Sequence, residues 1–175
     1  MSVNQSTDWS TKQKQFMELY EPLNDRLARF VYSMVWDREE ARDVISETVL
    51  AAYESFEKVR NHQAFLSYLF TIASRTWAKR IRKSKMMTSL SEVHTDHLAD
   101  ESSNVESRSE LNEFYAALST LPDKQREAVT LFEISGLSLN EIQEIQGGSL
   151  SGVKSRVTRG REELARMLER KKVKN

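Results

Sequence analysis

The sequence contains no cysteine, only two prolines and five glycines, and no long apolar run. Without cysteine the chain forms neither disulfides nor thiolate metal sites, which is typical of a cytoplasmic protein. So few glycines and prolines favour helices over a β fold with many tight turns. No apolar run approaches the ~20 residues of a membrane span, and the first residues lack the apolar core of a signal peptide. We therefore expect a helical, cytoplasmic protein without membrane insertion.

Charge is balanced overall but segregated along the chain. The 175 residues include 26 basic and 26 acidic ones, for a formal net charge of zero. Basic blocks cover residues 75–85 and 154–174, whereas acidic residues concentrate in 37–57 and 92–110. Segregated charge of both signs predicts two kinds of partner surface, one for a polyanion and one for a basic partner.

Apolar residues recur at helical spacing in four stretches of the chain. These stretches are residues 11–35, 37–56, 64–85 and 109–134. Pro22 is expected to break or kink the first helix, because proline lacks the amide hydrogen that a helix interior uses.

Between residues 86 and 108 the apolar periodicity fails, and serine, threonine, aspartate and glutamate dominate. This composition predicts a flexible acidic linker. The fold class that follows is all-α, with two small helical domains over residues 11–85 and 109–170.

Residues 136–168 have the pattern of a helix-turn-helix. Ser138 and Glu141 stand in capping-box spacing at the start of a short helix. Gly147–Gly148 suit a left-handed end to that helix, and Ser149 suits the N-cap of the next one.

The second helix of this motif has two different faces. One is an apolar stripe that is expected to pack on the scaffold, formed by Leu150, Val153, Val157, Gly160, Leu164 and Met167. Hydroxyl and cationic side chains lie off the stripe, where they could reach phosphates and base edges in a major groove. The residues that we predict to bind duplex DNA are Ser151, Lys154, Ser155, Arg156, Thr158 and Arg159. The alternative is an ordinary helical hairpin with a solvated basic face.

A second candidate DNA surface lies at the end of the helix over residues 64–85. Six cations in eleven positions repel one another unless an anion compensates. Aromatic rings beside cations suit single-stranded DNA, because bases stack on rings. The predicted contacts are Arg75, Trp77, Lys79, Arg80, Arg82 and Lys83. Phe65 and Phe70 are expected in the core, whereas Tyr68 and Trp77 are open to either role.

The outer face of the helix over residues 37–56 is acidic. Glu39, Asp43 and Glu47 share one face at intervals of four residues, which predicts a docking surface for a basic partner. Arg38 and Arg42 intrude and no second carboxylate cluster completes a coordination shell, so we expect no metal site. With no serine–histidine–acid set and no glycine-rich phosphate loop, we expect no catalytic residue, no cofactor and no enzymatic activity.

Four motifs in the second half and two segments in the first resemble one known family. The motifs are Leu121-Pro122, Gly136 to Ser138, Glu141-Ile142 and Val153 to Arg156, and the segments are DREEARDVISETVLAAYESF and FLSYLFTIASRTWAKRIRK. From about Phe16 to Leu168 the chain is similar to bacterial RNA polymerase sigma factors of the extracytoplasmic-function (ECF) group in the sigma-70 family. The resemblance implies that the first half docks on core RNA polymerase and reads and melts the downstream promoter element. It implies that the second half binds the upstream element, and that an anti-sigma factor is a partner.

Several positions depart from the family pattern. Arg75 and Lys79 stand where the family usually has asparagine and aspartate. Gln143, Gln146, Gly148 and Gly152 replace an alanine, two aliphatic residues and a threonine, which is expected to loosen the packing of the helix-turn-helix. Glycine at position 152 costs about 1 kcal/mol of helix stability relative to alanine.

Two other functions stay open. One is a helix-turn-helix transcription regulator without sigma activity, which leaves the acidic and the aromatic-basic helices unexplained. The other is a degenerate sigma-like protein that binds a partner without opening promoters, an option that Arg75 and Lys79 keep open.

Overall fold

The computed structural model describes residues 3–35, 37–59, 61, 64–87 and 113–172 of the chain. Within these ranges every regular element is helical, which confirms the all-α prediction. In the same part of the chain, no helix combines the length and the apolar character needed to cross a membrane.

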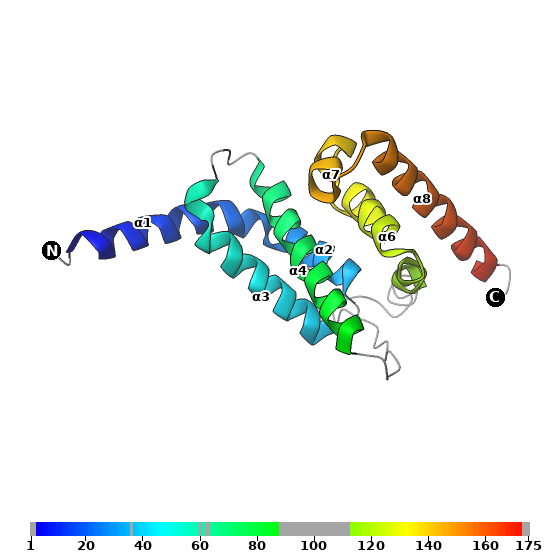
Figure 1. Cartoon of the computed structure of the whole chain (residues 1–175), viewed down its shortest axis with the longest axis horizontal. Coiled ribbons are helices and arrows are strands. Elements are labelled where there is room, and N and C mark those ends of the chain that lie inside the picture. Colours follow the sequence, from blue (N-terminus) through cyan, green and yellow to red (C-terminus); the bar gives the residue numbers. More distant parts are fainter. Residues whose placement is uncertain (1–2, 36, 60, 62–63, 88–112, 173–175) are drawn as a thin grey trace.

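The N-terminal helix is interrupted at Pro22, as predicted. Helix α1 (Val3–Tyr20) ends at the 3-10 turn η1 (Glu21–Leu23), which contains Pro22, and α2 (Asn24–Met34) continues the chain. Most of α1 projects away from the other helices (Figure 1). It is tied to them by Phe16, which is buried with its ring 5.3 to 5.7 Å from those of Tyr53, Phe56 and Phe65.

Helices α3 (Arg38–Glu54) and α4 (Phe65–Met87) pack against each other and against α2. Asp37 caps α3 by accepting a hydrogen bond from the amide of Glu40 at 2.7 Å, as its spacing predicted. A 3-10 turn, η2 (Phe56–Lys58), follows α3. Helix α4 extends to Met87, two residues beyond the predicted end of the helix, and residues 88–108 of the predicted linker lie outside the described residues.

The C-terminal half is a compact group of helices. Helical residues 113–119 precede α6 (Asp123–Val129), which continues into a π-helical turn, η4 (Thr130–Ile134). Helices α7 (Leu139–Gln146) and α8 (Leu150–Lys172) complete it. Its own small core is formed by Ala117, Leu118, Leu121, Val129 and Leu164.

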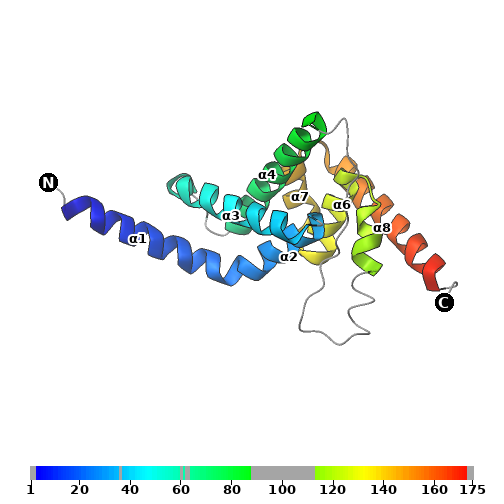
Figure 2. The same cartoon turned by 90° about the horizontal axis from the view of Figure 1, so that it is seen from below.

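The two halves pack against each other. Helix α7 lies against α4, and η4 lies against α2 (Figures 1 and 2). Side chains of the C-terminal half belong to the same buried core as those of α2 and α4; they are Leu131, Leu137, Ile142 and Val153. A guanidinium Nη2 of Arg26 on α2 donates to the carbonyl oxygen of Ser135 at 2.6 Å. The described halves therefore share the larger core, beside the small one of the C-terminal half.

Gly160 allows α6 and α8 to approach closely. A Cβ at this position would lie 2.4 Å from Cγ2 of Val129, a stiff β-branched side chain. Gly160→Ala is therefore expected to lower the free energy of unfolding by about 1–2 kcal/mol, because overpacking outweighs the better helix propensity of alanine. Urea denaturation followed by circular dichroism measures this change.

Gly152→Ala on the same helix is the matched control. Its Cβ would lie 3.2 Å from Ser149 Oγ, the N-cap hydroxyl of α8, which would need to shift by only a few tenths of an ångström. It is expected to be neutral or stabilising, by up to about 1 kcal/mol. A Gly160→Ala protein as stable as the parent would show that the close approach of the two helices is not needed.

Candidate nucleic-acid interface

The turn signals of the helix-turn-helix are confirmed. Ser138 Oγ accepts from the amide of Glu141 at 3.3 Å, and Glu141 accepts from the amide of Ser138 at 2.8 Å, which completes the capping box. Hydrogen bonds from Ser138 lower the pKa of Glu141, and smaller contributions come from Ser67 and Arg26 across the contact between the halves. The capped helix α7 is thus anchored to its own turn and to the other half.

Two glycines and a serine then redirect the chain. Gly147 and Gly148 have φ of +72° and +86°, a backbone region that favours glycine. Ser149 Oγ accepts from the amide of Gly152 at 3.1 Å and so caps α8. Helix α8 therefore begins where the sequence predicted.

Helix α8 presents the two predicted faces, with one exception. The stripe residues Val153, Val157, Gly160 and Leu164 are buried, and Met167 is half-buried. Leu150, the first residue of the helix, is 42% exposed, so its predicted inward position is wrong. Five of the six predicted DNA-binding residues on this helix are exposed: Ser151, Lys154, Ser155, Thr158 and Arg159. These five leave hydroxyls and two cations on the outside of the helix.

Arg156 differs from the other predicted DNA-binding residues of α8 because it is half-buried. Its Nε donates to Gln146 Oε1 at 2.8 Å, and its Nη2 donates to the carbonyl of Gly147 at 3.3 Å. This contact was not predicted, although the glutamine at position 146, in place of an aliphatic residue, was a signal for it. Its DNA contact stays a prediction, but the side chain is already engaged within the motif.

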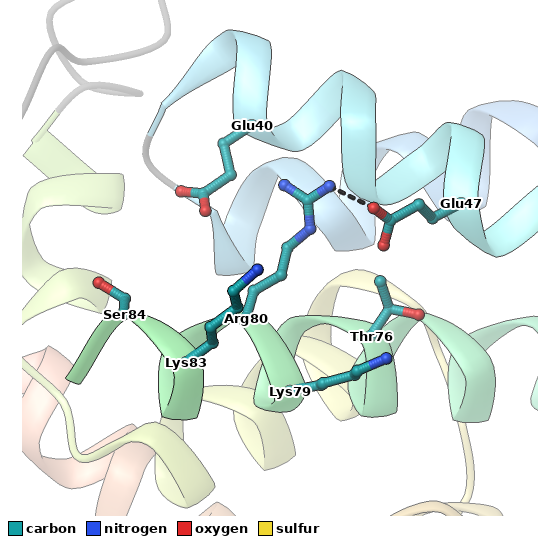
Figure 3. A pocket seen from close by; sticks show the side chains of 7 residues that line it. All are labelled: Glu40, Glu47, Thr76, Lys79, Arg80, Lys83 and Ser84. Carbon is teal, nitrogen blue, oxygen red and sulfur yellow. Dashed lines mark hydrogen bonds and ion pairs between the residues drawn. The ribbon is translucent and has the colours of Figure 1, made fainter. Parts of the chain in front are cut away.

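Helix α4 carries the other predicted DNA-binding surface. Arg75, Lys79, Arg82 and Lys83 are exposed. A groove of about 640 Å³ runs between α4 and α3, and Figure 3 shows the side chains that line it. They are Glu40, Glu47, Thr76, Lys79, Arg80, Lys83 and Ser84. The groove therefore mixes cations from α4 with carboxylates from α3.

Arg80 links the two predicted surfaces to each other. Its Nη2 lies 2.5 Å from Glu47 Oε1, and its Nη1 lies 3.8 Å from Asp43 Oδ2. The hydrogen bond to Glu47 raises the pKa of Arg80, and burial raises the pKa of Glu40 on the same side of the groove. A predicted DNA contact and two predicted polymerase contacts thus partly neutralise one another.

The acidic face of α3 remains open to solvent. Glu39, Asp43 and Glu47 are all exposed, and Glu39 accepts from Arg42 Nη1 at 2.7 Å. An exposed pair of this kind is worth less than about 1 kcal/mol, so it does not prevent a partner from competing for Glu39. The described residues contain no group of three His, Asp or Glu side chains placed to hold a metal ion.

The aromatic residues of α4 lie mainly in the core. Phe65 and Phe70 are buried, as predicted. The Trp77 ring is half-buried and lines a small apolar space with Phe30 and Val44, and its Nε1 is buried without a hydrogen-bond partner among the residues that the structure describes. The half-buried Trp77 ring thus packs against the core, and its contact with unpaired bases stays a prediction. The hydroxyl of Tyr68 is held 2.6 Å from Ser55 Oγ.

Both halves match known family models, and curated relatives align along most of the chain. Residues 19–86 match the model for sigma-70 region 2, and residues 111–164 match that for sigma-70 region 4. The ECF RNA polymerase sigma factor SigW of Bacillus subtilis is 30% identical over 169 residues, covering 89% of this chain and 90% of that protein. The chain belongs to the ECF sigma factors. EcfG of Rhodopseudomonas palustris is 29% identical over 142 residues, covering 81% of this sigma factor and 78% of that protein.

Solved structures show the same fold at lower identity. The sigma factor RpoE of Bartonella quintana, in complex with the anti-sigma factor NepR, has a TM-score of 0.74 at 24% identity and covers 87% of this sigma factor and 98% of that chain. CnrH, in complex with the cytosolic domain of CnrY, has a TM-score of 0.66 at 21% identity and covers 90% of this sigma factor and 89% of that chain. The arrangement of helices in this sigma factor is therefore one that its structural neighbours also adopt.

Proposed function

We propose that this sigma factor docks on core RNA polymerase through α3, recognises promoter DNA with α4 and α8, and promotes strand opening. The observation that carries the proposal is the capped helix α8, whose buried stripe leaves Lys154, Ser155 and Arg159 exposed together. Relatives that cover 89% and 81% of the chain are named RNA polymerase sigma factors. The functional units are residues 11–85 and 109–170, joined by 86–108.

Further parts of the proposal concern the setting, a partner and the DNA-facing residues of α4. The protein acts in the cytoplasm, where core polymerase and promoter DNA are, and it performs no catalysis of its own. An anti-sigma factor regulates it, since the similar RpoE was solved with the anti-sigma factor NepR. Its DNA-facing residues on α4 are Arg75, Lys79, Arg82 and Lys83, with Arg80 linking them to the acidic face.

In vitro transcription tests the proposed function. Purified core polymerase is combined with this protein and genomic DNA fragments, and transcripts that core enzyme alone does not make are expected. A helix-turn-helix regulator without sigma activity would bind fragments but give no new transcripts with core enzyme. A degenerate sigma-like protein would bind a protein partner and give neither result.

Arg159→Ala is expected to weaken closed-complex formation about tenfold, because the side chain is exposed on α8 and its guanidinium can donate hydrogen bonds to a phosphate. The slope of log affinity against log salt concentration should fall by about one unit. Footprinting at several salt concentrations measures both quantities. Permanganate reactivity of unpaired thymines in promoters that are already bound should remain at the parent level. An unchanged salt slope would remove the phosphate contact from Arg159.

A further inference from the structure

A chain of polar contacts runs from α6 through the end of α7 to α8. The Glu127 side chain is only 7% exposed and lies 3.1 Å from Lys124 Nζ. Its Oε2 accepts from Gln146 Nε2 at 2.7 Å, and the same Nε2 lies 3.0 Å from the carbonyl oxygen of Lys124. Gln146 Oε1 in turn accepts from Arg156 Nε at 2.8 Å. We name Glu127, Gln146 and Arg156 the polar chain.

The polar chain also closes the turn before α8. Carbonyl groups at a helix end lack partners within the helix. Arg156 Nη2 donates to the carbonyl of Gly147, and Gln143 Nε2 donates to the carbonyl of Gly148 at 2.9 Å. The two glutamines that were expected to loosen the motif are therefore engaged: Gln143 holds the turn, and Gln146 joins α6 to α8.

The position of Arg156 gives these contacts a functional consequence. Its guanidinium points back toward the turn, whereas its neighbours Lys154, Ser155 and Arg159 are exposed. A displacement of α8 relative to α6 would move all three exposed side chains together. Side chains that bind a ligand together must be held within about 0.5 Å of their productive positions.

We propose that Gln146 and Arg156 are positioning residues that orient the DNA-facing side chains of α8 through the polar chain. Arg156 affects DNA binding by holding the helix and makes no phosphate contact of its own. This inference rests on the proposed function of α8 as a DNA-binding helix.

The contact itself is tested in the full chain without DNA. In the ¹⁵N-labelled protein, the Nε–H signal of Arg156 is assigned by its absence in Arg156→Lys. Its exchange with solvent is expected to be slow and to become at least about tenfold faster in Gln146→Leu, because the acceptor is removed. Equal exchange rates in the two proteins would overturn the polar chain.

The positioning role is tested by binding to a duplex of about 30 base pairs over about 0.05–0.3 M salt, measured by fluorescence anisotropy. Arg156→Ala and Gln146→Leu are each expected to weaken binding about fivefold with an unchanged salt slope, whereas Arg159→Ala lowers the slope by about one unit. The variant with both changes should bind the duplex no more weakly than either single variant, because both changes break the same polar chain.

Three results contradict the inference. A salt slope lowered by one unit in Arg156→Ala assigns that side chain a phosphate contact of its own. A lower melting temperature with unchanged affinity in both single variants shows a role in stability alone. If the parent protein has no affinity for the duplex and cannot be distinguished from Arg159→Ala, α8 has no DNA-binding role and therefore no positioning role. In that case the exchange of the Arg156 Nε–H stays slow, which shows that the polar chain is intact and that the proposed function has failed.

Discussion

Replacing both Asp43 and Glu47 with lysine is expected to abolish binding of this sigma factor to core RNA polymerase. Both carboxylates lie exposed on the same face of α3. Reversing their charge turns attraction for a basic partner into repulsion, and close charge pairs at interfaces carry several kcal/mol, so a loss of at least about a hundredfold is expected. Titration of labelled sigma factor with core enzyme measures the affinity, and circular dichroism verifies that helicity is retained.

Two controls separate docking from general charge effects. Glu21→Lys with Asp25→Lys makes the same charge change on exposed positions of η1 and α2, and is expected to leave core affinity unchanged. Arg80→Gln removes the cation that pairs with Asp43 and Glu47 but keeps both carboxylates, so core binding should persist. A double-lysine variant of α3 that binds core enzyme normally would contradict the docking role.

Trp77→Ala is expected to lower the free energy of unfolding by about 3 kcal/mol. The ring fills space beside Phe30 and Val44, and truncating a large packed aromatic side chain leaves a cavity. The loss falls at the lower end of the usual range because the side chain is half-buried and its Nε1 already lacks a partner. Urea denaturation of the two proteins measures the difference.

Trp77→Leu distinguishes packing from stacking. Leucine fills part of the same apolar space but offers no aromatic face to a base. Its unfolding free energy is expected to fall by less than that of the alanine variant, and promoter opening by the folded protein should proceed at the parent rate. Slow opening by a fully folded leucine variant would show that the ring stacks on exposed bases.

Local features of the sequence predicted the helices and their ends. Proline at position 22, the caps at Asp37 and Ser138, and the glycine pair at 147–148 act on backbone groups within a few residues, so their effect is readable from spacing alone. The exposed face of α8 was predicted for the same reason, because helical periodicity separates it from the buried stripe.

Contacts between distant residues were not predicted. Arg80 pairs with residues 33 and 37 positions earlier in the chain, Gln146 contacts Glu127 on another helix, and Arg26 reaches Ser135 across the two halves. Each depends on which faces the helices turn toward one another, which composition and periodicity do not determine. Leu150 was wrongly predicted to be buried for a related reason: the apolar stripe of α8 continues to the first residue of the helix, but burial of the stripe does not.

The packing of η4 on α2 and of α7 on α4 joins two parts of a single polypeptide. Such a contact forms at an effective concentration on the order of millimolar, whatever the amount of protein in solution. A separate molecule that binds one of these covered faces must displace the other half of the chain. At micromolar concentration, with contacts of equal quality, it is outcompeted about a thousandfold, which corresponds to about 4 kcal/mol. Ligands of the covered faces therefore need either greater affinity than the contact they replace or a second attachment elsewhere on the protein.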